Sequence, residues 1–265
     1  MTTSDQLGNQ AQGTQRQSGI YVYGIVPGDL RVDEDARGVG DPPGRVEVIR
    51  EGDVGALVSE VQIDRALGTP DDLQAHEQVL DRTASIAPVL PMRFGAVLTD
   101  ADSVATEVLR DHHDEFAKAL SELKGRAEYI VKGRYNENAI LGEVLSENAQ
   151  AQALRDDIRS KPEDASRDSQ MALGEIISNA IEAKRQADTQ TVVSALEGVA
   201  SFVNVRPPTH EYDAVHVAML VETDRQSDVE QAMNKLLENW GDRMQLRLLG
   251  PLAAYDFVVA SAPGG

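Results

Sequence analysis

The segment TASIAPVLPMRFGAVLTD, residues 83–100, restricts the fold more than any other part of the sequence. It is apolar from Ile86 to Leu98, yet it contains Pro88 and Pro91. A proline inside a helix removes a backbone donor and clashes with the preceding turn, and it pushes the residue before it towards extended conformations. The segment therefore predicts an extended, proline-bounded connection between two helices.

A single arginine, Arg93, interrupts this apolar segment shortly before Gly95. In an extended chain, successive side chains face opposite sides. This alternation predicts two sets: Leu90, Met92 and Phe94 on one side, and Val89, Pro91 and Arg93 on the other. We therefore expect Arg93 to leave the core and to pair with a carboxylate or with backbone carbonyls, because an unpaired buried guanidinium is costly. A ligand-binding role for Arg93 is the alternative.

The first half of the chain predicts an α+β arrangement. Thr69 and Pro70 indicate the start of a helix that runs to about residue 86, since threonine is favoured at the N-cap and proline at the first helical position. A second helix, capped by Thr99 with Asp102, is expected to end at Gly125. Strands are predicted at residues 20–26, 46–49, 54–59 and 127–132, the second and third forming a hairpin. This order indicates an antiparallel sheet with helices on one face.

The second half predicts a helical region followed by another group of strands. Helices are expected at residues 136–160, 169–199 and 227–240, and strands at residues 201–205, 214–221, 244–249 and 255–260. The charged residues 156–168 are the best candidate for a mobile connection. The strand–strand–helix–strand–strand order could form a second, ferredoxin-like layer.

The composition excludes several classes of function. The chain has 265 residues and a formal net charge of −19, with no cluster of lysine and arginine visible along the sequence, which disfavours nucleic acid as a partner. It has no cysteine, so disulfides and thiol chemistry are excluded. No apolar run reaches the roughly 20 residues that a membrane helix requires. The polar residues 1–19 are typical of a disordered tail rather than a signal peptide.

No motif in the sequence requires catalysis. His76 with Glu77 suggests a general acid–base pair, but a half-buried structural histidine is the simpler interpretation. His112 and His113 are adjacent, so on one helix they point about 100° apart and cannot readily bind one metal. We therefore expect no catalytic, cofactor-binding or metal-binding residues and no cofactor. An acid–base enzyme would require His76, Glu77 and Arg93 to converge in one cleft.

Six segments in order along the chain resemble the gas vesicle protein L/F family. They are YVYGIV at 21–26, VGALVSEV at 54–61, HEQVL at 76–80, VLPMRFGAVL at 89–98, EYIVKG at 128–133 and LLGPLAAYDFV at 248–258. The resemblance covers nearly all of the chain after residue 19, while residues 136–200 match weakly. It implies two α+β domains, antiparallel sheets with helices packed on them, the second a modified ferredoxin-like fold. We accordingly expect a tail at 1–19 and domains at 20–135 and 136–265.

This resemblance implies an accessory or minor structural protein of gas vesicle formation and not an enzyme. The implied partners are the main gas vesicle shell protein and other gas vesicle accessory proteins, with no nucleic acid and no membrane, and the implied location is the cytoplasm, in association with gas vesicles. An acidic protein could cover the apolar face of the shell protein in the manner of a chaperone, and an unpaired sheet edge could add a strand to it. A ligand-binding regulatory α+β protein is the alternative.

Overall fold

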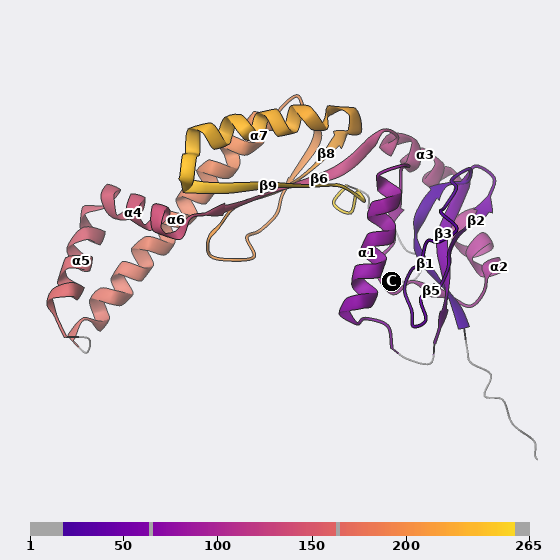
Figure 1. The fold of residues 1–265 in the computed structure, drawn as a ribbon, viewed down its shortest axis with the longest axis horizontal. Coiled ribbons are helices and arrows are strands. Elements are labelled where there is room, and N and C mark those ends of the chain that lie inside the picture. The colour runs from indigo at the N-terminus through magenta and orange to yellow at the C-terminus, as the bar shows by residue number, and fades with distance from the viewer. Residues whose placement is uncertain (1–17, 64–65, 163–164, 258–265) are drawn as a thin grey trace, which may run out of the picture.

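The computed structural model describes residues 18–63, 66–162 and 165–257. Its elements are β1 (Ser18–Pro27), β2 (Val46–Glu51), β3 (Val54–Gln62), α1 (Pro70–Ala84), β4 (Leu90–Pro91), β5 (Val97–Leu98), α2 (Ala101–Ser103), η1 (Val104–Arg110), α3 (His113–Leu123), β6 (Arg126–Tyr135), α4 (Glu137–Glu147), α5 (Ala149–Ser160), α6 (Arg167–Leu196), β7 (Ala200–Val205), β8 (Asp213–Glu222), η3 (Thr223–Arg225), α7 (Gln226–Trp240), η4 (Gly241–Arg243) and β9 (Met244–Leu252). They form two antiparallel sheets with helices packed on them, which confirms the predicted α+β class (Figure 1). The expected tail lies almost wholly outside the described residues.

The first sheet has the strand order β2-β3-β1-β4, and β5 also pairs with β1. The predicted hairpin of β2 and β3 is confirmed, and its turn contains Gly52 at a φ of +63°, a left-handed conformation that glycine adopts without strain. The two central strands, β1 and β3, are buried along most of their length. They form the centre of the first half of the molecule.

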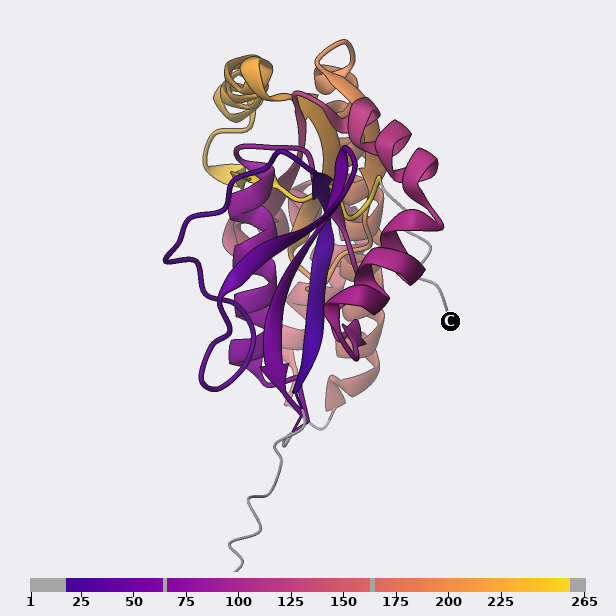
Figure 2. The same ribbon diagram turned by 90° about the vertical axis from the view of Figure 1, so that its right-hand side faces the viewer.

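Helices cover both faces of this first sheet, so the prediction of helices on one face is wrong. One core contains Tyr21, Tyr23 and Leu57 of the sheet with Leu80 of α1. The other contains strand residues of the opposite face with side chains of η1 and α3, such as Phe116. Figures 1 and 2 show α1 on one side of the sheet and α3 on the other. Apolar side chains on both faces of β1 and β3 require this double cover.

The predicted start of α1 is confirmed, whereas the next helix begins differently. The Thr69 hydroxyl accepts a hydrogen bond from the Asp72 N–H, the Asp72 carboxylate accepts one from the Thr69 N–H, and Pro70 is the first helical residue. In the second helical region, the N-cap is Asp100, whose carboxylate accepts from the Ser103 N–H at 2.8 Å, not Thr99. A carboxylate is favoured at this position because it also interacts with the positive end of the helix.

The segment between these helices is extended as predicted, and Arg93 is exposed. Leu90 and Met92 enter the core beneath η1 and α3. Phe94, however, packs with the core under α1, so the expected alternation fails after Arg93, where the chain turns at Gly95 (φ +91°). Within the described residues, no hydrogen bond or ion pair involves Arg93, and the expected carboxylate or carbonyl partner is absent there.

The second sheet has the order β7-β8-β6-β9, with α6 and α7 packed on one face (Figure 1). With the intervening helices, β6-α-β7-β8-α7-β9 has the element order of a ferredoxin-like fold. Strand β6, which the sequence analysis assigned to the first sheet, lies at the centre of the second, between β8 and β9. Its partners are about 80 residues or more further along the chain, and no local pattern reveals such a pairing.

The end of the described chain returns to the first sheet. Ala253 and Ala254 are buried in the two cores of that sheet, and the Ala253 N–H donates to the Asp81 carboxylate of α1 at 3.1 Å. The strand predicted at 255–260 is wrong for residues 255–257, which form a turn, and residues 258–260 lie outside the described residues. The division into domains at residue 135 stays a prediction.

The helical region between the two halves consists of three helices. The predicted helix 136–160 is interrupted at Asn148, whose side chain accepts from the Ala151 N–H and caps α5. Helix α6 then continues for 30 residues. None of the helices in the described part of the chain is both long and apolar enough to cross a membrane.

Candidate partner-binding site

Strand β7 is an edge strand that exposes large apolar side chains. It ends the strand order of the second sheet, and within the described residues no strand pairs with its outer side. Phe202 is 60% exposed, Val205 is 54% exposed and Val203 is 37% exposed. A bare edge with apolar side chains is a template for pairing with another chain, and proteins commonly protect such edges with charge or proline. This edge has no such protection between Ala200 and Val205.

The register of β7 places its apolar side chains on both faces of the sheet. Val203 lies opposite Met219 and Val205 opposite Val217, whose side chains belong to the core under the helices. Phe202 faces the other way and lies near Phe257, with 6.5 Å between ring centroids. A strand that added to β7 would therefore find apolar contacts on both of its own faces.

The hydrogen bond of Arg206, directly after β7, indicates which residues of the strand point their backbone groups towards β8. The Arg206 N–H donates to the His216 carbonyl at 2.8 Å, so Arg206 points its backbone groups towards β8. In an antiparallel ladder, alternate residues point these groups to opposite sides. Val203 and Val205 accordingly direct their N–H and C=O groups outward, where an added strand would bond.

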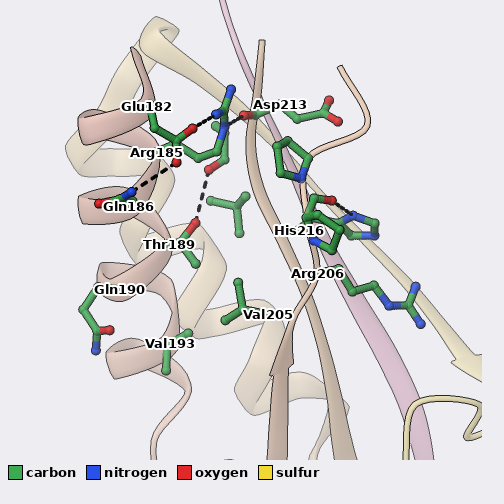
Figure 3. A pocket seen from close by; sticks show the side chains of 14 residues that line it. Glu182, Arg185, Gln186, Thr189, Gln190, Val193, Val205, Arg206, Asp213 and His216 are labelled. Atoms are coloured by element: carbon green, nitrogen blue, oxygen red, sulfur yellow. Dashed lines mark hydrogen bonds and ion pairs between the residues drawn. The ribbon is translucent and has the colours of Figure 1, made fainter. Parts of the chain in front are cut away.

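A hollow lies between α6 and the β7–β8 connection, beside this edge. It has a volume of about 530 Å³, and its walls include Val193 and Gln190 of α6 and Val205 of β7. Figure 3 shows the two valines on opposite walls. At its upper end, the Arg185 guanidinium bonds the Asp213 and Glu211 carbonyls at 2.6 and 2.7 Å, and the Thr189 hydroxyl bonds the Ala214 carbonyl at 3.3 Å. These bonds join α6 to the β7–β8 connection and to the start of β8.

On the face of the sheet opposite Val203 and Val205, an arginine directly after β7 forms ion pairs with two carboxylates. The Arg206 guanidinium lies 2.9 Å from the Glu128 carboxylate and 2.7 Å from the Asp256 carboxylate. Glu128 is 1% exposed, and burial raises its pKa to about 7 despite the neighbouring guanidinium. No role for Glu128 or Arg206 could be assigned from the sequence, because 78 residues separate the two and no motif joins them. The ion pair of Arg206 with Glu128 holds the C-terminal end of β7 in place.

Of the three groups considered for acid–base chemistry, His76 and Glu77 line the same hollow, whereas Arg93 does not. His76 is 3% exposed, its Nδ1 lies 3.0 Å from the Tyr21 hydroxyl, and burial lowers its pKa to about 4. Glu77 lies on the surface, where it lines a hollow together with Glu128. The packed setting of His76 therefore favours the structural interpretation.

His112 and His113 have separate partners. The Nε2 atom of His113 lies 2.7 Å from the Asp53 carboxylate, whereas the Nδ1 atom of His112 faces Glu115 at 3.6 Å. Across the described ranges, no group of three histidine or acidic side chains has an arrangement that could hold a metal ion. That no catalytic, cofactor or metal site exists in the whole chain stays a prediction.

Comparisons with known proteins agree with the resemblance found in the sequence. The family model described as "Gas vesicle synthesis protein GvpL/GvpF" matches residues 19–259. Gas vesicle protein F of Streptomyces sp. (strain CB03234) is 32% identical over 239 residues, which cover 90% of this chain and 98% of that protein. Gas vesicle protein F of Dolichospermum flosaquae is 25% identical over 240 residues, 90% of this chain and 96% of that protein.

The fold also has a counterpart among solved structures. The crystal structure of the gas vesicle protein GvpF from Anabaena sp. PCC7120 superposes with a TM-score of 0.74 and 24% identity, covering 92% of this chain and all (100%) of that one. This likeness concerns the fold, whereas the family match and the 32% identity concern the sequence over most of its length. The chain belongs to the gas vesicle synthesis protein GvpL/GvpF family.

Proposed function

We propose that this protein is an accessory or minor structural component of gas vesicle formation that binds the main shell protein through the outer edge of β7. The observation that carries this proposal is the exposure of Phe202, Val203 and Val205 on an unprotected edge strand. Strand addition supplies affinity through main-chain hydrogen bonds and specificity through the alternate side chains. Other gas vesicle accessory proteins are further proposed partners.

The charge of the chain suits this task. A shell protein with a large apolar surface aggregates before it enters a wall, and burial of that surface against a partner prevents this. A partner with a formal net charge of −19 would also keep the complex dispersed, since like-charged complexes repel one another. We propose that the protein acts at the growing vesicle, in the cytoplasm.

The edge can be tested by co-purification of the tagged protein with the main shell protein, co-expressed without other accessory proteins. We expect the wild type to retain the shell protein and the double variant Val203→Lys/Val205→Lys to lose it. The matched control is Ile86→Lys/Met171→Lys, which makes the same chemical change at two residues that are 71% and 70% exposed elsewhere. Equal loss in both variants would show that general surface apolarity, and not this edge, mediates retention.

A proline variant separates the backbone contribution from the side-chain contribution. Val205→Pro removes an outward N–H without removing a bond to β8, and proline is tolerated at such edge positions. Loss of one interstrand hydrogen bond of about 1 kcal/mol should weaken shell-protein binding roughly fivefold. Unchanged binding of Val205→Pro, with loss in the lysine variant, would replace strand addition by side-chain contact alone.

A further inference from the structure

Three cationic side chains and one histidine form a row across the face of the second sheet that α6 and α7 do not cover. The register places Lys132 of β6 directly opposite His216 of β8 on one side and Arg247 of β9 on the other. Side chains at directly opposite positions share a face and have Cβ atoms about 4.5–5.5 Å apart. Arg134, two residues after Lys132, lies on the same face, and all four residues line one hollow of about 220 Å³. We call His216, Lys132, Arg247 and Arg134 the cation row.

The permanent charges of this row have no partner in the part of the chain that the structure describes. Neither an ion pair nor a side-chain hydrogen bond involves Lys132, Arg134 or Arg247 there, and Lys132 and Arg247 are exposed. Some cations elsewhere are closely paired, such as Lys184, which lies 2.6 Å from both Glu143 and Glu147. With 44 acidic and 25 basic residues, the chain has carboxylates in excess, but none of those in the described ranges forms an ion pair with the row.

Carboxylates also lie beside the row. Asp213 lines the same hollow as the row, and Glu77, Asp81 and Glu128 line a hollow together with Lys132. The Asp213 carboxylate accepts hydrogen bonds from the Thr209 hydroxyl and N–H and from the His210 N–H, each at 2.8–2.9 Å. The Glu128 carboxylate pairs with Arg206 at 2.9 Å. Glu128 is thus paired with a cation outside the row, whereas Asp213 keeps its negative charge and lies opposite Arg134, because hydrogen bonds from neutral donors do not neutralise a carboxylate.

The arrangement opposes folding. Like charges directly opposite each other on neighbouring strands destabilise a sheet. The like-charged pair is Lys132 with Arg247, because the pKa of His216 is lowered, mainly by burial, so that its ring is neutral near pH 7. Its Nδ1 atom bonds the Pro207 carbonyl at 3.2 Å, and its Nε2 atom is buried and has no partner within the described residues. A row of this kind is explained more readily by an anionic ligand than by the stability of the fold.

We propose that the cation row is a docking surface for a short acidic segment of another protein. Neighbouring strands are about 4.8 Å apart, so the outer members of the row are separated by roughly 10 Å. Glutamate or aspartate side chains three or four residues apart on a helix lie about 5–6 Å from one another, close to the separation of neighbouring members of the row. A carboxylate can form charge-assisted hydrogen bonds with both lysine and arginine.

The negative charge of the whole chain favours a short acidic segment as the ligand over an extended polyanion such as nucleic acid. The whole chain carries a formal net charge of −19, which repels nucleic acid beyond the immediate surroundings of the row. A segment with a few carboxylates interacts mainly within one screening length, about 8 Å at physiological salt, where the row dominates. The row lies on the opposite face from the side chains of Val203 and Val205, so this inference does not depend on the proposed shell-protein site.

The test uses the full-length protein and a fluorescent peptide in which glutamate alternates with alanine, with a glutamine–alanine peptide as the neutral comparison. Fluorescence anisotropy at low salt should show binding of the glutamate peptide only. Lys132→Gln/Arg247→Gln should weaken it about tenfold or more. The matched control Arg159→Gln/Lys235→Gln removes two exposed cations from α5 and α7, changes the net charge equally, and should bind within about twofold of the wild type.

Three outcomes would overturn the proposal. They are failure of the glutamate peptide to bind the wild type, equal loss in the control variant, and tighter binding of a single-stranded oligonucleotide than of the peptide at the same salt. Retention of binding by the charge-preserving variant Lys132→Arg/Arg247→Lys would support it. Thermal denaturation of each variant verifies that loss of binding is not loss of folding.

Discussion

The two sheets of this protein are similar in strand content but differ in what covers them. The first lies between α1 on one face and η1 with α3 on the other, and its central strands are almost wholly buried. The second has α6 and α7 on one face only, an exposed edge at β7, and cations on its free face. The residues of the first sheet are therefore explained by burial in its two cores. The second sheet has exposed apolar and cationic side chains that contribute little to a core.

The largest test of this difference compares two apolar truncations. Leu57→Ala in β3 removes a side chain with 0% exposure and should cost about 2–5 kcal/mol of unfolding free energy, because it leaves a cavity. Phe202→Ala in β7 removes a larger side chain that is 60% exposed and should change stability by about 0.5 kcal/mol or less. Urea denaturation measures both. Similar losses of unfolding free energy in the two variants would contradict the view that the Phe202 side chain contributes little to stability.

The second test concerns pH and the buried Glu128 near the junction of the sheets. Its folded-state pKa is about 7, above the ordinary value of 4.5, so between these values the folded protein retains a proton that the unfolded chain has released. The contribution of Glu128 to stability is therefore full below about pH 4.5 and falls as the pH rises through 7. The loss should be on the order of 1–3 kcal/mol.

The difference between the wild type and Glu128→Gln isolates this contribution. His76, with a pKa lowered to about 4 from 6.5, acts in the opposite direction, since its contribution is full above pH 6.5 and falls with acidification towards 4. It does so equally in both proteins. Denaturation at several pH values from 5 to about 8 should show the two proteins diverging as the pH rises. Parallel curves would mean that Glu128 stays ionised in the fold.

The smallest expected effect is a gain in stability on the free face of the second sheet. Lys132→Gln removes a charge that lies opposite both Arg247 and His216, and it should stabilise the protein by about 0.2–1 kcal/mol. The same change at the exposed Lys235 of α7 should have no measurable effect. A loss of stability in Lys132→Gln would show that an interaction of the lysine outweighs the repulsion, and would weaken the case for a functional row.

The features of this fold that could be predicted from the sequence are those that depend on residues close together in the chain. Thr69 and Pro70 start α1 because their effects act within one helical turn. The hairpin of β2 and β3 and the exposure of Arg93 follow from equally short-range rules. The position of β6 could not be predicted, because the choice of sheet depends on partners distant in the sequence.

The candidate sites depended even more on the tertiary structure. The run Phe202-Val203-Asn204-Val205 has the composition of an ordinary half-buried strand, and only its place at the end of the sheet reveals its exposure. Lys132, His216 and Arg247 are far apart in the sequence, where no cluster of basic residues is visible, and the register of three strands brings them together. Family resemblance indicated the biological role, while the binding surfaces required the arrangement of the strands.

The return of the chain after β9 has a consequence for synthesis on the ribosome. The first sheet consists of early residues, but Ala253 and Ala254 complete its two cores. Because the ribosome makes the chain from its N-terminus, all of the second sheet emerges before these cores can close. The first sheet therefore lacks these two core residues until the second sheet has been synthesised, and its complete packing depends on both halves of the chain.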